Sequence, residues 1–233
     1  MAKKKNKDGK KNVIPEYLVI ELLSDTTFST GYETMGQVDT EVDYDNLGLP
    51  KVGGKTLHGL LRDGWLTFAN KFETMDKNNL TEKVFGLEKS NKDKCILRIS
   101  DALFCGDNNI EEMSLDEIEN FRSWLDYYEK ENENITSEKL LNLFTSIRTQ
   151  NSIDHNGISS DGFLRFSRVV NSGIKLKSKL IWFEKPRKDD LRCLAISALS
   201  VRNVGLARNR GRGFVKITLN GDWELTKQLA EGK

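Results

Sequence analysis

The order of its short apolar segments constrains the fold of this chain more than any other feature. A strand-like segment is followed by a helix-like one, then by a second strand-like segment and a long acidic stretch. Two more strand-like segments, a helix-like segment and a last strand-like segment complete the pattern. The strand-like segments are 17–23, 95–103, 163–170, 175–183 and 213–219, and the helix-like segments are 56–68 and 190–201. This order matches the ferredoxin-like β-α-β-β-α-β plan, so we expect an α+β fold with a ferredoxin-like, RRM-like core and long loops.

Periodicity and end signals support these assignments. Residues Tyr17–Leu23 are apolar and partly β-branched, and a proline and a serine lie near their two ends, which is typical of a strand. Thr56 is expected to cap the first helix, because the apolar residues that follow it share one helical face. The strands at 163–170 and 175–183 are expected on either side of a turn at 171–173.

The acidic stretch predicts a helical insertion at about 106–150 in this core. Ser114 and Glu117 have the spacing of a capping box, and the apolar residues after them recur at helical intervals. A second helix is expected over 137–147, packed back against the first. We therefore expect a single domain over 13–233 that carries this insertion.

Composition limits the classes of protein to consider. The 233 residues are 30% charged with a formal net charge of +1, but the charge is unevenly distributed. Segment 1–12 is rich in lysine and is expected to be a disordered basic arm, whereas 111–138 is acidic and 202–216 is basic. No apolar run is long enough to span a membrane, and the lysine-rich start lacks the apolar core of a signal peptide. We therefore expect a cytoplasmic protein without a membrane partner.

The three cysteines do not predict a metal site. Cys95, Cys105 and Cys193 form no C-x-x-C pair, and the sequence adds only two histidines, His58 and His155. Structural zinc needs four closely spaced ligands of these types. We therefore expect reduced cysteines and no structural zinc.

The loop at 205–213 combines glycine and arginine in a way that favours a polyanion site. Its nine residues hold three glycines and three arginines, and a strand pattern follows at once. Glycine lets the backbone approach a bulky anion, and arginine donates two hydrogen bonds to one phosphate. A plain turn with solvated arginines is the alternative, and nearby strand aromatics (Phe166, Trp182, Phe214) fit base stacking or core packing. The expected contacts are Arg208, Arg210, Gly211, Arg212 and Gly213.

The loop at 36–45 carries four carboxylates and leads into a basic helix start. Two valines interleave with the acids, so part of the loop is expected to pack against the protein. A carboxylate beside a phosphodiester can hold a divalent metal or orient the attacking oxygen. The alternative is a solvated surface loop. The basic residues that follow, where a phosphate can dock at the helix start, are Lys51, Lys55, His58 and Arg62.

Two other motifs are candidate catalytic features. Gly53-Gly54-Lys55-Thr56 has the ending of a nucleotide-binding phosphate loop, but the first glycine of that motif is expected at position 49, which is Leu49. Hydrolysis of ATP or GTP is therefore not expected. His155, in a turn-rich segment, is a candidate general base, although a single histidine in a turn usually has no catalytic role.

Four segments in order resemble the RAMP superfamily, the repeat-associated RNA-binding subunits of CRISPR effector complexes. The resemblance runs from the first strand to the last. It is carried by 36–42 with 48–50 and 57–62; by Val84-Phe85-Gly86; by Arg148 with 153–154, 162–164 and 169–170; and by Gly205, Arg210, Gly211 and Gly213.

This resemblance implies a subunit of a type III effector complex that binds guide RNA, target RNA and other effector subunits. It implies an RNA contact at Arg148, and it matches Asp39 to the aspartate with which backbone subunits cut the paired target RNA. The implied cofactor is a divalent metal, Mg²⁺, held by Asp39 while the neighbouring ribose 2′-hydroxyl attacks. Two alternatives stay open: a non-catalytic architectural or guide-end-capping subunit, and a stand-alone repeat-RNA processing endonuclease with His155 or His58 as base.

Overall fold

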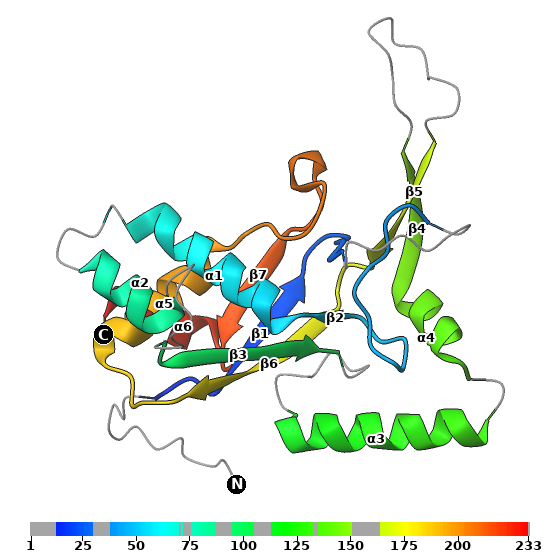
Figure 1. The fold of residues 1–233 in the computed structure, drawn as a ribbon, viewed down its shortest axis with the longest axis horizontal. Coiled ribbons are helices and arrows are strands. Elements are labelled where there is room, and N and C mark those ends of the chain that lie inside the picture. The colour runs from blue at the N-terminus through cyan, green and yellow to red at the C-terminus, as the bar shows by residue number, and fades with distance from the viewer. Residues whose placement is uncertain are drawn as a thin grey trace, which may run out of the picture.

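The computed structural model describes residues 13–29, 38–69, 71, 76–86, 95–104, 113–132, 135–150 and 164–232 (Figure 1). Three features of the sequence analysis lie outside the described residues: the expected basic arm at 1–12, Cys105, and the turn that carries His155.

A five-stranded antiparallel sheet forms the centre of the molecule, in the order β2-β3-β6-β1-β7. Strand β2 is a two-residue addition at the edge. The other four strands have the order β3-β6-β1-β7, which is that of a ferredoxin-like sheet: the first and third strands of the β-α-β-β-α-β plan, here β1 and β6, lie in the middle. The expected fold class is thus confirmed. The strands are β1 (Tyr17–Leu22), β2 (Lys51–Val52), β3 (Leu97–Leu103), β6 (Lys175–Trp182) and β7 (Val215–Leu219).

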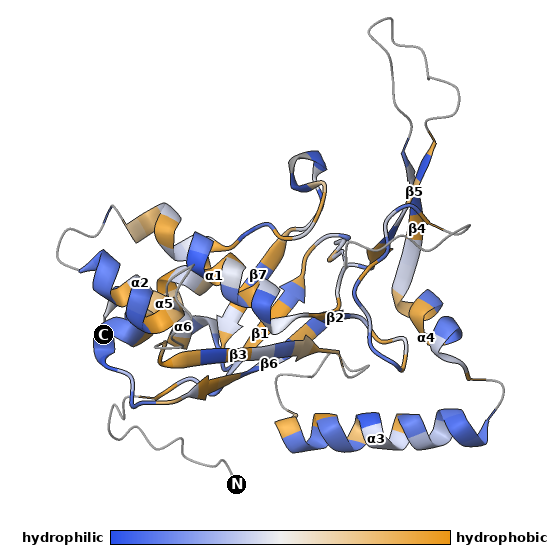
Figure 2. Ribbon diagram, viewed as in Figure 1, coloured by the Kyte–Doolittle hydropathy of each residue, from blue (hydrophilic) through white to orange (hydrophobic). Residues whose placement is uncertain are grey.

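Four helices of the described ranges cover one face of this sheet (Figures 1 and 2). Strand alternation points Leu18, Ile20 and Leu22 toward them, and all three side chains are buried in the main core. Trp65 of the first helix is also fully buried, and its indole N–H donates to Thr81 Oγ1 at 2.8 Å, which satisfies the polar atom of this ring. The helices are α1 (Gly54–Ala69), α2 (Lys77–Phe85), α5 (Lys188–Ser200) and α6 (Trp223–Glu231).

Helix α3 (Leu115–Glu131) covers part of the opposite face. The predicted capping box is present, with Ser114 Oγ accepting the Glu117 N–H at 3.1 Å. On the sheet, Lys177 is only 3% exposed: its ammonium donates to Met113 O and lies 3.7 Å from the centre of the Tyr17 ring. RRM-type modules bind RNA on this face of the sheet, so here α3 and its approach already occupy part of that surface.

A two-stranded arm projects from the main sheet (Figure 1). It consists of β4 (Thr145–Gln150) paired with β5 (Arg165–Val170), and helix α4 (Ser137–Phe144) leads directly into it. The helix expected over 137–147 therefore ends at Phe144, because the next six residues pair with β5 as a strand. The strands on either side of the 171–173 turn exist, but they belong to different sheets: β5 pairs with β4, and β6 pairs with β1 and β3.

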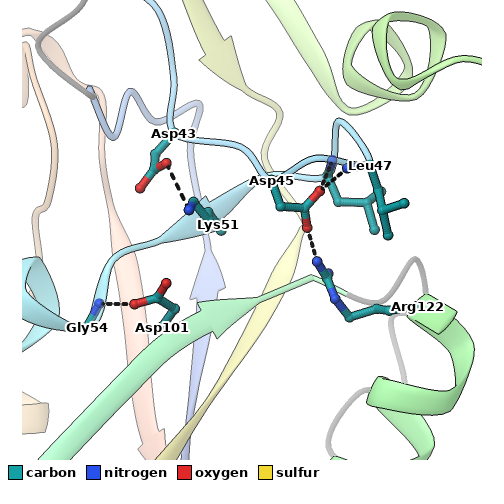
Figure 3. A network of polar contacts seen from close by, with 8 residues as sticks. Asp43, Asp45, Leu47, Lys51, Gly54, Asp101 and Arg122 are labelled. Carbon is teal, nitrogen blue, oxygen red and sulfur yellow. Dashed lines mark hydrogen bonds and ion pairs between the residues drawn. The ribbon is translucent and has the colours of Figure 1, made fainter. Parts of the chain in front are cut away.

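The first helix begins differently from the sequence prediction. Thr56 is not its cap: the helix starts at Gly54, whose N–H donates to Asp101 Oδ1 at 2.8 Å (Figure 3). A carboxylate from β3 thus satisfies one of the unpaired N–H groups at the helix start. No helix in the described ranges is long and apolar enough to cross a membrane.

Candidate nucleic-acid interface

A groove of about 910 Å³ separates the loop at 205–213 from the arm. The loop and the arm project on the same side of the central sheet (Figure 1). The described residues that line the groove include four arginines and no carboxylate, so its walls are strongly cationic. Such walls favour a polyanion over a neutral ligand. The four arginines are Arg165, Arg208, Arg210 and Arg212.

Two glycines allow the two ends of the 205–213 loop to meet, and we call this meeting point the neck of the loop. Gly205 and Gly213 have φ of +73° and +75°, and a Cβ at Gly213 would lie 2.0 Å from Val204 O. The neck is joined by the Val204 N–H, which donates to Gly213 O at 2.8 Å, and by the Gly213 N–H, which donates to Asp25 O at 3.0 Å. Because this neck is tight, the short 3₁₀ turn Arg208–Arg210 is held out toward the groove.

The arm supplies the opposite wall. Arg210 Nη1 donates to Gln150 Oε1 at 3.1 Å, which links the loop to the end of β4. Arg165 and Ser167 of β5 also line the groove. Sequence reasoning missed Arg165, although its two-residue spacing from Ser167 in a strand pattern places both on one face.

Arg148 lies on the arm but is engaged by a carboxylate. Its Nη2 atom donates to Asp25 Oδ2 at 2.6 Å, and its side chain is 53% exposed. This ion pair ties β4 to the segment that follows β1. Arg148 thus presents a partly neutralised guanidinium near the groove.

Asp39 lies beside β5, one residue from the groove wall. Its Oδ2 accepts the Phe166 N–H at 2.6 Å, and its own N–H donates to Phe166 O at 2.8 Å. The next residue, Thr40, bridges to Ser167 and lines the groove. The structure therefore brings the expected catalytic aspartate to the edge of the cationic groove.

The remaining acids of the loop have structural partners. Glu41 Oε1 lies 2.9 Å from Arg168 Nε in a pair whose side chains are 7% and 5% exposed. Asp45 accepts the N–H groups of Leu47 and Leu49 at 2.8 and 3.0 Å and pairs with Arg122 of α3 (Figure 3). These contacts fix the loop between the arm, the sheet and α3.

Asp43 and Lys51 form a looser pair, with 3.7 Å between Oδ1 and Nζ (Figure 3). Partial burial raises the pKa of Asp43, Lys51 opposes this shift, and the nearby Asp101 adds to it. Lys51, one of the expected RNA contacts, therefore has its positive charge partly neutralised by the Asp43 carboxylate.

The other expected contacts on α1 lie apart from the groove-lining residues. The His58 ring meets Phe85 of α2 edge-on, with 5.5 Å between ring centroids. Burial lowers the pKa of His58 and Arg62 lowers it further, so the imidazole is neutral at pH 7 and offers no charge to a phosphate. Arg62 is one helical turn further on the same face, and Lys55 is exposed in the first turn.

A metal ion at Asp39 would need ligands from RNA. Among the residues that the structure describes, no group of three or more His, Cys, Asp or Glu side chains can hold a metal ion. Mg²⁺ commonly binds one or two protein carboxylates and takes its other ligands from water and substrate phosphates. Asp39 at the edge of a cationic groove fits that kind of site.

The sequence model of the RAMP superfamily matches residues 19–216, which include most of the core, both loops and the arm. The chain belongs to the RAMP superfamily. The resemblance inferred from the four sequence segments is thus confirmed. Comparison of this RAMP protein with curated proteins gives no match.

Solved structures show the same fold in other proteins. A chain of a structure described as "Type III-B Cmr-beta Cryo-EM structure of the Apo state" has a TM-score of 0.63 at 14% identity, covering 89% of the RAMP protein and 97% of that chain. A chain of "Cryo-EM structure of the Type III-B Cmr-beta bound to cognate target RNA" has a TM-score of 0.59 at 13% identity, covering 93% and 99%. At these identities the similarity concerns the fold.

Proposed function

We propose that this protein is a guide-RNA-binding subunit of a cytoplasmic type III CRISPR effector complex, and that it cleaves the paired target RNA with Asp39 and a divalent metal. One observation carries the proposal: a groove lined by four arginines lies one residue from Asp39, the aspartate that the sequence resemblance matches to the family's catalytic residue. Family membership and the fold shared with subunits of Cmr-beta complexes support it.

The chemistry of cleavage suits the groups present. The 2′-hydroxyl of a ribose gives its proton to solvent as its oxygen attacks the adjacent phosphorus. The bond to the 5′-oxygen breaks and this oxygen takes a proton from solvent, which leaves a 2′,3′-cyclic phosphate and a 5′-hydroxyl. This reaction needs in-line geometry, which arginines bound to neighbouring phosphates can impose. A bound Mg²⁺ supplies charge stabilisation at the phosphate. The Asp39 carboxylate would hold this ion, and no protein nucleophile is required.

RNA binding is tested by co-expressing the tagged chain with its genomic neighbours and sequencing the RNA that co-purifies. Short RNAs of uniform length with a constant repeat-derived end support a guide-binding subunit. Replacing Arg208, Arg210 and Arg212 by alanine should weaken binding. The slope of log K against log salt concentration should become shallower by about 0.7 for each phosphate that the variant no longer neutralises. The matched triple lysine variant keeps the charge and should keep most of that slope. Random RNA fragments, or binding unchanged by the alanine triple, would contradict this assignment.

Cleavage is tested separately with Asp39→Asn in the assembled complex. We expect loss of Mg²⁺-dependent cleavage of a complementary target while target binding is retained. Equal cleavage by the variant would remove Asp39 from the mechanism and leave the architectural or end-capping alternative. The stand-alone endonuclease alternative receives no support at His58, whose ring packs against Phe85 away from the groove-lining residues.

A further inference from the structure

A second, smaller pocket adjoins the arginine groove. Its volume is about 230 Å³, and it opens at the start of α1. It shares Thr27, Gly205, Leu206 and Arg208 with the groove, so the two spaces have a common wall. A ligand whose phosphate lies on Arg208 can therefore extend directly into this pocket.

Gly53 lines the pocket between Asp43 and Thr56. A Cβ at this position would meet Thr56 Oγ1 at 3.8 Å and Asp43 Oδ2 at 3.9 Å, which are ordinary contact distances. The backbone there is outside the left-handed region, so the fold does not require glycine. The missing side chain leaves space between a carboxylate and a hydroxyl.

The chemistry of the walls matches a nucleobase. Phe28, Val52, Leu60 and Leu206 provide apolar surface for the faces of a planar ring. The Asp43 carboxylate, whose Oδ1 lies 3.7 Å from Lys51 Nζ, can accept hydrogen bonds from a base at one place, and Arg208 can donate at another. The volume is below the roughly 300–1,000 Å³ typical of drug-sized ligands, in keeping with a single base.

Guanine matches these groups best. Its N1 and N2 present two adjacent N–H donors to a carboxylate, while O6 and N7 accept from arginine. Uracil instead has carbonyl oxygens on both sides of its single ring N–H, and these repel a carboxylate. Burial raises the pKa of Asp43 because its carboxylate loses hydrogen bonds to water. Two N–H groups of guanine would replace those hydrogen bonds and stabilise the charged form.

We infer that this pocket takes one unpaired base of the RNA held in the groove, preferably guanine, with Asp43 accepting from N1 and N2. The inference rests on the proposed RNA binding. It assigns base selectivity to Asp43, a residue that the sequence marked only as one of four loop acids.

The test measures the affinity of the full chain for uridine oligomers that carry one central guanosine, adenosine, cytidine or uridine, by fluorescence anisotropy. We expect the guanosine oligomer to bind about tenfold tighter than the all-uridine one, which is the usual size of a two-bond base contact. Asp43→Asn should reduce this preference to about twofold or less. Gly53→Ala should also reduce it, because the added methyl group takes space beside the Asp43 carboxylate.

Gly59→Ala is the matched control, since a Cβ at Gly59, on the helix that follows Gly53, meets nothing within 4 Å. This variant should keep both the full preference and the all-uridine affinity, and circular dichroism spectra that match the wild type show that Asp43→Asn and Gly53→Ala are folded. Equal wild-type affinity for the four oligomers, or an unchanged preference in Asp43→Asn and Gly53→Ala, would overturn the inference alone. Failure of every oligomer to bind would overturn the proposed RNA binding, and the inference with it.

Discussion

Asp39 and Phe166 are joined by two hydrogen bonds: the Asp39 carboxylate accepts the Phe166 N–H at 2.6 Å, and the Asp39 N–H donates to Phe166 O at 2.8 Å. The residue proposed for catalysis thus also holds its loop against β5. A substitution at Asp39 therefore tests two properties, and the two can be separated by the choice of side chain.

We expect Asp39→Asn to keep the loop in place, because its amide oxygen can still accept the Phe166 N–H. Asp39→Ala loses that acceptor and should be less stable than Asp39→Asn by about 1 kcal/mol. Urea unfolding of the two variants and the wild type measures this difference. Equal stability of the two variants would show that the carboxylate contact does not hold the loop.

Gly213 and Gly211 predict a contrast within one loop. Both have positive φ, but a Cβ would lie 2.0 Å from Val204 O at Gly213 and would meet nothing within 4 Å at Gly211. Gly211→Ala should cost about 1–2 kcal/mol for the left-handed backbone alone. Gly213→Ala should cost more than about 3 kcal/mol, because the neck of the loop must also open. Thermal or urea unfolding decides, and similar costs for both would argue against a closed neck.

The buried pair of Glu41 and Arg168 predicts a large effect of removing one charge. Arg168 also donates to Asn142 Oδ1 at 2.7 Å at the base of the arm. Glu41→Gln leaves this guanidinium buried without its counter-charge, so the free energy of unfolding should fall by about 3 kcal/mol. The control is Glu224→Gln, which breaks an exposed pair with Lys227 and should change stability little. A small effect at both sites would mean that water reaches Arg168.

His58 predicts a pH dependence of stability. Its pKa in the folded state is below the ordinary value of 6.5, first because of burial and then because of Arg62. As the pH falls below about 6.5, the unfolded state binds a proton before the folded state does, so the protein loses stability. Above this value the contribution is constant. Below pH 6.5, the free energy of unfolding of His58→Gln should fall less than that of the wild type. Urea unfolding at several pH values measures this difference. Parallel pH profiles would place the effect elsewhere.

Local periodicity was sufficient to predict the central fold. The strand and helix patterns from Tyr17 to Leu219 specified the ferredoxin-like order, because each segment is long or regular enough to show its period. Strand β4 was not predicted, since it follows α4 without a break and its partner strand is needed to distinguish it from more helix. Helices α2 and α6 were also missed, although an aspartate and a glycine lie at the two ends of each (Asp76 and Gly86, Asp222 and Gly232).

The candidate site was predictable only in part. The arginines of the 205–213 loop and Asp39 were both identified, but their proximity depends on β5, which lies between them and pairs with distant residues. Arg165 belongs to the candidate site only because the fold places the arm beside the 205–213 loop. The burial of His58 depends on α2, a helix absent from the sequence prediction. Tertiary packing, which local patterns do not encode, decides each of these cases.

The Asp101 carboxylate at the start of α1 has a consequence for the path of RNA. The positive end of a helix normally attracts a phosphate, but here a carboxylate already neutralises it, and Asp43 lies close by. A phosphodiester therefore gains little from the dipole of α1, and the arginines of the 205–213 loop attract it more strongly. An RNA strand bound as proposed would therefore lie with its backbone on the loop side and its bases toward the pocket at the start of α1.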